Sequence, residues 1–211
     1  LQQRITAVMR YAVHNALIEQ NPAYDLAGAV ISTKSTHRPA LPLERLTELM
    51  QRIEAYKGKG VTQIATQLTL LTFVRSSELR FARWSEVDFK NSLWTIPGER
   101  RELNGVKYSA RGAKMKSPHL VPLSKQAKEL LQQLHAISGE KELMFIGFSR
   151  DDKPISENTV NKALRTMGYD TKVEVCGHGF RTMACSALIE SGLWTRDAVE
   201  RQMSHQERNS V

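Results

Sequence analysis

The sequence contains few cysteines, no long apolar run and fewer acidic than basic residues. Its two cysteines, Cys176 and Cys185, are too few for the disulfide framework of a small secreted domain. With the neighbouring His178 they lack the CxxC or HxxxH spacing of a zinc site, so we interpret both as reduced thiols. The longest apolar stretch, Leu68 to Val74, is far shorter than the roughly 20 residues of a membrane span. No apolar core of a signal peptide follows the first arginines.

What the sequence does have is the composition of a globular protein with an excess of positive charge. Its 211 residues are 41% hydrophobic and 25% charged, which excludes a largely disordered chain and fits one domain, or one domain and part of another. Thirty lysines and arginines against 22 acidic residues give a net charge of +8. This excess favours a polyanionic partner such as nucleic acid, although many basic proteins bind none.

Apolar periodicity predicts a mainly α-helical α+β protein with one small three-stranded antiparallel sheet. A helical pattern runs from the first residues to Asn21-Pro22, and the polar, basic stretch after it is typical of a linker. We therefore expect three parts: the last helix of a preceding domain in residues 1–31, a linker in 32–40, and the main domain in 41–211.

Local signals predict the elements of the main domain. Helices are expected over about 42–56 and 61–74, short strands near 87–89, 93–96 and 119–123, and four helices after them. Ser124, Ser156 and Thr195 are expected to cap three of those four helices. Gly168 and Gly192 are expected to follow the ends of two of them.

Two places combine an arginine with a polar partner three residues away. Arg75 ends the most apolar predicted helix, and the carboxylate of Glu78 can hold its guanidinium. His178 and Arg181 begin another helix, whose free N–H groups suit an anion, and the glycines on either side of His178 allow a ligand to come close. Taken singly, the first place is more typical of an ordinary ion pair at a helix end, and the second is as typical of a helix start at the surface as of a functional site.

Two further places carry isolated cations. Residues 112–118 put Lys114 and Lys116 in a turn, which alone indicates a solvated loop, and His205 closes the last helix, where a histidine usually complements the helix dipole. Together, however, the four places form a set. Two arginines can bind the non-bridging oxygens of a phosphate, a histidine can move a proton near neutral pH, and a lysine can protonate a leaving oxygen. The set predicts phosphoryl transfer by side-chain cations, without a metal or a cofactor.

With these residues in view, the sequence resembles the tyrosine recombinases of the phage integrase family, in particular integrases of satellite prophages and pathogenicity islands. The resemblance covers about residues 1 to 211. It rests on five segments in the family's order: LTFVRSSELR around Arg75, LWTIP, PHLVPLS, HGFRTMA from His178, and ERQMSHQERN around His205.

The resemblance implies an integrase-type catalytic domain in residues 41–211, preceded by the end of a DNA-binding domain in 1–31. It implies that Arg75 and Arg181 hold the scissile phosphate and that Glu78 supports Arg75. His178 would accept the proton of the nucleophile, and His205 would donate to a phosphate oxygen. The reaction would exchange DNA strands through a 3′-phosphotyrosyl link.

The hairpin between the second and third strands departs from the family pattern, because it is longer than in similar integrases. The resemblance implies that Lys114, seven residues before Val121, is the general acid for the 5′ oxygen, with Lys116 as the alternative. Basic residues of the hairpin are expected to contact DNA phosphates, and a loop without defined structure is the equal alternative. These residues are Arg100, Arg101, Lys107, Arg111 and Lys116.

A second departure concerns the nucleophile, which the family places roughly ten residues after the position of His205. All five tyrosines of this sequence precede His178. We therefore expect a chain truncated before its nucleophile and inactive as given.

The resemblance also implies partners. The substrate would be double-stranded DNA attachment sites, on which four copies of the protein form a homotetramer, whereas the free protein can be a monomer. An excisionase and a host DNA-bending protein would be further partners. The location would be the bacterial cytoplasm, at the nucleoid. Two alternatives stay open: a non-catalytic DNA-binding protein on the same scaffold, and a hydrolytic nuclease that forms no covalent adduct.

Overall fold

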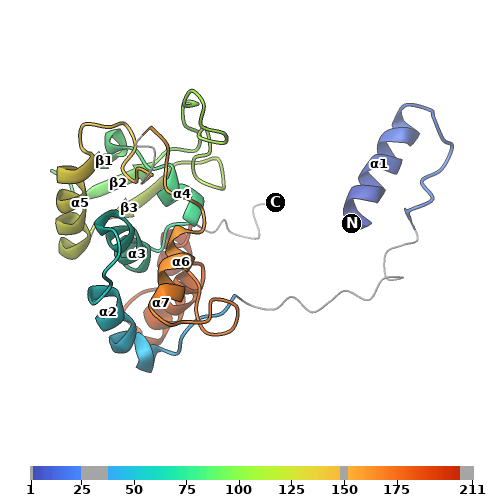
Figure 1. Cartoon of the computed structure of the whole chain (residues 1–211). Helices are drawn as coiled ribbons and strands as arrows, with labels where there is room; N and C mark the ends of the chain where they lie inside the picture. The colour runs from blue at the N-terminus through green and yellow to red at the C-terminus, as the bar shows by residue number, and fades with distance from the viewer. Residues whose placement is uncertain (1, 25–37, 148–151, 205–211) are drawn as a thin grey trace. The chain divides into compact units, whose positions relative to one another are not determined.

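The computed structural model describes residues 2–24, 38–147 and 152–204, which belong to two compact units, 1–37 and 38–211 (Figure 1). The first unit holds one helix, α1 (Gln2–His14). The predicted continuation of this helix to Asn21 is wrong, because Ala16 adopts a left-handed conformation (φ 53°) that closes the helix. Most of the linker predicted over 32–40 lies outside the described residues.

The second unit is mainly helical, as predicted. Its helices and 3-10 turns are η2 (Leu43–Arg45), α2 (Leu46–Glu54), α3 (Gly60–Thr72), α4 (Ser76–Arg80), η3 (Trp84–Glu86), α5 (Lys125–Ser138), α6 (Thr159–Thr166), α7 (Gly179–Glu190) and α8 (Arg196–Gln202). In the described part of the chain, no helix is long and apolar enough to cross a bilayer.

Most of the predicted helix ends are confirmed. The Ser124 hydroxyl accepts a hydrogen bond from the third residue of α5 at 3.2 Å, and Thr195 does the same for α8 at 3.3 Å. Gly168 (φ 93°) and Gly192 (φ 66°) adopt the left-handed conformation beyond α6 and α7. Ser156 does not cap α6, because the N-cap is Asn158, two residues later.

The sheet has the order β1–β2–β3, with both neighbouring pairs antiparallel. Its strands are β1 (Val87–Asp88), β2 (Leu93–Ile96) and β3 (His119–Pro122). In β3 the alternating side chains of His119 and Val121 are buried, whereas Leu120 and Pro122 face solvent. Pro122 ends an edge strand, which is the position that the missing N–H of proline allows.

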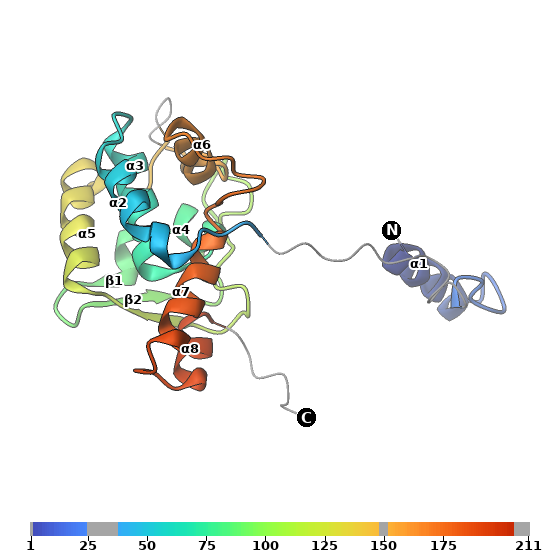
Figure 2. The ribbon, with the colours of Figure 1, turned by 90° about the horizontal axis from the view of Figure 1, so that it is seen from below.

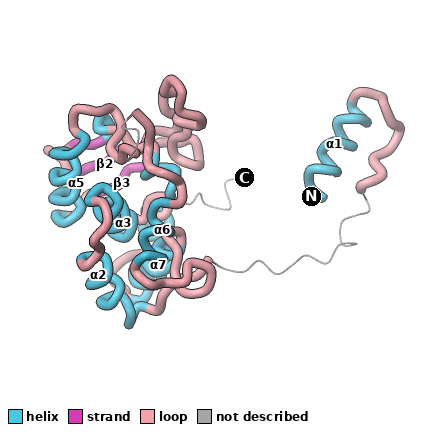
Figure 3. Tube along the Cα trace, in the orientation of Figure 1, coloured by secondary structure: helices cyan, strands magenta, loops and turns pink. Residues whose placement is uncertain are grey.

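Helix α3 lies at the centre of the second unit and packs against α2, α5, α6 and α7 (Figure 2). Its residue Leu68 belongs to a core shared with β2, β3 and α5, represented by Trp94 and Leu131. A second core lies among α2, α6 and α7, with Leu49 and Phe180 fully buried. Helix α3 is therefore held from several sides, and Figure 3 shows it among α2, α5, α6 and α7.

The long segment between β2 and β3 is folded back on itself. Glu99 and Arg111 form an isolated β-bridge, and the Arg100 N–H donates to the Ala110 carbonyl at 2.9 Å. At the base of the segment, a Cβ on Gly112 would lie 2.1 Å from the Pro97 carbonyl oxygen, so this close approach requires glycine. The segment thus has a defined structure, which a loop of its length does not guarantee.

Candidate active site

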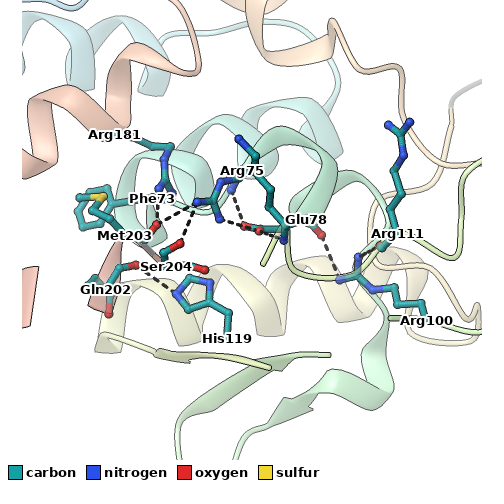
Figure 4. Close-up of polar contacts among 11 residues, drawn as sticks. Phe73, Arg75, Glu78, Arg100, Arg111, His119, Arg181, Gln202, Met203 and Ser204 are labelled. Atoms are coloured by element: carbon teal, nitrogen blue, oxygen red, sulfur yellow. Dashed lines mark hydrogen bonds and ion pairs between the residues drawn. The ribbon is translucent and has the colours of Figure 1, made fainter. Parts of the chain in front are cut away.

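Arg75 lies in the turn between α3 and α4, immediately before α4. Phe73 adopts a left-handed conformation (φ 57°) and ends α3, so Arg75 begins the next helix and does not end the apolar one as predicted. Glu78 accepts hydrogen bonds from the Arg75 backbone N–H at 2.9 Å and from its Nη1 at 3.0 Å (Figure 4). The predicted Arg75–Glu78 pair is therefore present.

Glu78 is fully buried and faces donors from two segments of the chain. Burial alone would raise the pKa of its carboxyl group. The hydrogen bond from the Arg75 N–H and the Arg75 charge outweigh burial, so the pKa stays below its ordinary value. The carboxylate also accepts the Lys114 backbone N–H at 3.3 Å. Glu78 is thus ionised at neutral pH and joins the α3–α4 turn to the β2–β3 segment.

Arg181, on the first turn of α7, is brought to the same place. It is only 6% exposed and donates to the carbonyl groups of Phe73 and Met203. Arg75 donates through Nη2 to the Ser204 carbonyl at 3.0 Å, so both guanidinium groups reach the end of α8 (Figure 4). Burial, assisted by the positive charge of Arg75, lowers the pKa of Arg181 to about 10, which still leaves it protonated at neutral pH.

His178 occupies the N-cap position of α7, where part of its side chain faces solvent and part is covered by the protein. Partial burial lowers its pKa, and so do the positive charges of its neighbours. A histidine in this setting is neutral at pH 7 and can accept a proton. The neighbouring charges that act on it are Arg181, Arg38, Arg75 and Lys114.

The glycines beside His178 serve the protein's own packing. A Cβ on Gly179 would lie 2.0 Å from the Pro39 carbonyl oxygen, and one on Gly177 would lie 3.0 Å from the Val160 side chain. Packing within the same unit therefore already accounts for both glycines, and the close approach of a ligand at these positions stays a prediction.

The structure brings Lys114 to this cluster from the β2–β3 segment. Its side chain is exposed, its backbone is held by Glu78, and its charge acts on His178. Lys116 lies two residues further along in a left-handed turn (φ 58°), and its carbonyl faces Gly98. Lys114, whose charge acts on His178, stays the predicted lysine of the site.

The basic residues of the β2–β3 segment separate into two kinds. Arg101, Lys107 and Arg111 are exposed, as a contact with DNA requires, with Arg101 paired to Glu142. Arg100 is different: its side chain is 1% exposed and forms an ion pair with Glu86. The prediction that Arg100 contacts DNA is wrong, because its buried guanidinium is paired with the Glu86 carboxylate through both Nε and Nη2.

His119 is a residue of the site that the sequence analysis missed, and His205 lies outside the described residues. His119 is 5% exposed, and its Nε2 lies 3.1 Å from the Gln202 carbonyl oxygen (Figure 4). Burial lowers its pKa, and the charges of Glu78, Arg181 and Arg75 all reach it. The alternation of β3 could have identified it, since His119 shares the inward face with Val121.

The described residues contain no group of three or more metal-type ligands. Cys176 and Cys185 are free thiols. What the arrangement offers instead is a set of cations from three segments of the chain, gathered near an ionised carboxylate. Such a cluster suits a phosphate, whose oxygens accept the hydrogen bonds of guanidinium groups.

Comparison with known proteins gives the same picture. The model of the phage integrase family matches residues 40–211. The integrase of Enterobacteria phage P4 is 64% identical over all 211 residues, which make up 48% of that protein. The chain thus spans about half the length of the curated relatives it matches.

Solved structures confirm the fold predicted from the sequence. The integrase of transposon Tn1549, in complex with transposon right end DNA, matches 98% of this chain and 70% of its own with a TM-score of 0.74 at 15% identity. A lambda integrase tetramer bound to a Holliday junction matches 100% of this chain and 58% of its own with a TM-score of 0.67 at 18% identity. Since the family model covers most of the sequence, the chain belongs to the phage integrase family.

Proposed function

We propose that this chain carries the catalytic part of a site-specific tyrosine recombinase that cuts and rejoins DNA through a 3′-phosphotyrosyl link. The observation that carries the proposal is the meeting of Arg75, Arg181, His178 and Lys114 around the buried Glu78 carboxylate. Binding to DNA alone does not need a proton acceptor and a proton donor beside two arginines held in place by the protein. Residues 41–211 are the proposed catalytic domain, and 1–31 the end of the domain before it.

Each residue has a part in the proposed reaction. A tyrosine hydroxyl attacks the phosphorus while His178, neutral at pH 7, takes its proton. Arg75 and Arg181 bind the non-bridging oxygens and stabilise the charge that grows on them. Lys114 gives a proton to the departing 5′ oxygen, and the O–P bond to that oxygen breaks. A 5′-hydroxyl then attacks the phosphotyrosine, the same steps run in reverse, and His205 is proposed to donate to a phosphate oxygen.

The nucleophile is proposed to be a tyrosine other than the five in this sequence. Tyr169 is 3% exposed and its ring lies beneath the Arg52 guanidinium at 4.7 Å, where no DNA can reach it. Tyr108 lies on the β2–β3 segment with the Arg111 guanidinium over its ring at 4.4 Å. All five precede His178, whereas the family places its nucleophile after the position of His205, so the 211-residue chain is expected to bind DNA without forming an adduct.

Double-stranded DNA attachment sites are the proposed substrate, and several copies are proposed to act together at the nucleoid. The named DNA complexes of Tn1549 and lambda integrases, the latter a tetramer, support this assembly. An excisionase and a host DNA-bending protein are proposed as further partners on the ground of the family alone.

The test uses the product of the complete reading frame beside the 211-residue chain. Each is mixed with a nicked suicide substrate carrying the element's attachment site, and an adduct that survives SDS is sought. We expect an adduct with the complete protein that Arg75→Ala and Arg181→Ala abolish, while Arg52→Ala, a partly buried arginine on α2, keeps it. Bound DNA without any adduct would favour the non-catalytic alternative, and broken DNA without an adduct would favour a hydrolytic nuclease.

A further inference from the structure

Arg100 and Glu86 form a buried ion pair outside the residues assigned to the reaction. Arg100 Nε and Nη2 donate to the two carboxylate oxygens of Glu86 at 2.5 and 2.8 Å, and the two side chains are 1% and 6% exposed. The Glu86 carboxylate also accepts the Trp94 indole N–H at 3.0 Å. A buried ion pair contributes little net stability, since desolvation opposes the attraction, so its fixed geometry is the property to explain.

The remaining donors of Arg100 tie three segments of the chain together. Nη1 donates to the Arg111 carbonyl at 2.7 Å, which closes the base of the β2–β3 segment (Figure 4). Nη2 also reaches the Glu78 carbonyl in α4 at 3.3 Å. Through Glu86, the same guanidinium is fixed to η3. One side chain therefore connects both ends of the segment to the helix that carries Glu78.

The short stretch from Arg111 to Lys114 is consequently held at both ends by the same residue. The Glu78 carbonyl holds Arg111 through Arg100, and the Glu78 carboxylate accepts the Lys114 N–H directly at 3.3 Å. Between them, the Ala113 N–H donates to the Pro97 carbonyl at 2.8 Å. Since Glu78 also holds Arg75, the backbone of Lys114 has a fixed place relative to the phosphate-binding arginine.

We propose that Arg100, held by Glu86, is a positioning residue that aligns Lys114 with the phosphate site. The proposal rests on the proposed function, in which Lys114 protonates the departing 5′ oxygen. Arg100 itself touches neither the DNA nor the reacting atoms. Without its guanidinium, the base of the β2–β3 segment loses its connection to α4, and Lys114 spends less time within reach of the leaving oxygen.

The test compares two leaving groups in the complete protein. One suicide substrate has the natural 5′-bridging oxygen, and the other has a 5′-bridging sulfur, which leaves as a thiolate and needs no general acid. Arg100→Met is expected to cleave the oxygen substrate at least about tenfold more slowly than wild type, and the sulfur substrate within about threefold of it, because only the first requires a placed proton donor. Equal slowing on both substrates, or no slowing on either, would overturn the proposal.

Further variants keep the outcome interpretable. Arg100→Lys retains the charge beside Glu86 but cannot make all the contacts of the guanidinium. It should therefore also cleave the oxygen substrate more slowly than the sulfur substrate, to a smaller degree, and it can be measured even where Arg100→Met fails to fold. Arg52→Met is the matched control: its guanidinium donates to the Met167 carbonyl at 2.8 Å in the other core, and the ratio of the two rates should match wild type.

Lys114→Ala separates the two proposals. Rescue of Lys114→Ala by the sulfur substrate supports its role as general acid whatever Arg100 does. If Lys114→Ala stays slow on sulfur while Arg100→Met is rescued, the general acid is another residue and the positioning role attaches to that one. If Lys114→Ala is rescued and the Arg100 variants are not, the proposed function stands and the positioning role fails.

Discussion

The α3–α4 turn and the β2–β3 segment deliver cations to the same site by different means. The turn holds Arg75 with a carboxylate only three residues away, in a helix start that short sequence spacing encodes. The segment holds Lys114 through contacts that span 36 residues to Glu78 and, by way of Arg100, 14 residues to Glu86. The first arrangement is local and forms with its helix, whereas the second exists only once the sheet and α4 have packed.

Removing a cation beside the α3–α4 turn should have the largest effect on the rate of strand cleavage. Arg181 is such a cation, because it donates to the Phe73 carbonyl and sits beside Arg75. Arg181→Ala is expected to slow strand cleavage by at least about 10²–10³-fold, the size of effect seen when a donor to a developing oxyanion is lost. DNA affinity should fall only modestly, with a salt slope lower by about one unit.

Single-turnover cleavage and binding at several salt concentrations measure these two quantities. Because Arg181 is buried, thermal unfolding of the variant has to be compared with that of Arg52→Ala, a partly buried arginine of α2. Full cleavage by a folded Arg181→Ala protein would show that Arg181, beside the α3–α4 turn, has no part in the proposed site.

The Glu78→Gln substitution acts on both regions at once. Its carboxylate accepts hydrogen bonds from Arg75 and from the Lys114 backbone, and removing one partner of a buried ion pair costs about 3 kcal/mol of unfolding free energy. The folded-state pKa of Glu78 lies below its ordinary 4.5, so this stabilisation is complete above about pH 4.5 and is lost as the pH falls through the lowered pKa.

Urea unfolding at pH 7 and at pH 3 tests the direction of this pH dependence. The difference in unfolding free energy between wild type and Glu78→Gln should be large at pH 7 and smaller at pH 3. A constant difference at both pH values would mean that the ionised form of Glu78 contributes nothing, and that shape alone explains its burial.

The same contrast explains which features the sequence could predict. The caps Ser124 and Thr195 and the Arg75–Glu78 pair depend on partners within four residues, and they were predicted correctly. Arg100 was assigned to DNA because an arginine in a basic loop usually faces solvent, and its burial depends on Glu86, which only the folded segment brings to it. Ser156 failed as a cap for a smaller reason, since its hydroxyl accepts the N–H of Asn158, the residue that precedes α6.

A smaller effect is expected from the exposed cations of the β2–β3 segment. Lys107→Ala should lower the salt slope of DNA binding by about one unit and leave cleavage at saturating DNA unchanged, because the lysine is proposed to contact backbone phosphate only. Arg101 is the matched comparison, being 73% exposed but paired with Glu142. Arg101→Ala should change the slope less. Equal slopes for wild type and Lys107→Ala would exclude this residue from the DNA interface.

The smallest expected effect concerns a cation that belongs to neither region. Arg38 is exposed and lies at the start of the second unit, and its charge, after burial and the charge of Arg181, helps to lower the pKa of His178 below its ordinary 6.5. Arg38→Ala should therefore raise the pKa of His178 slightly, as expected for the loss of one exposed positive charge acting through water.

A base with a higher pKa is protonated sooner on acidification. The acid limb of the cleavage rate, measured at saturating DNA from pH 5 to 8, should move to higher pH in Arg38→Ala, with the rate at pH 8 unchanged. Arg75 from the turn and Lys114 from the segment act on His178 in the same direction, but each also has a proposed part in the reaction. Arg38 offers the cleaner test: a limb that stays in place or moves to lower pH would show that His178 is not the group that accepts the proton.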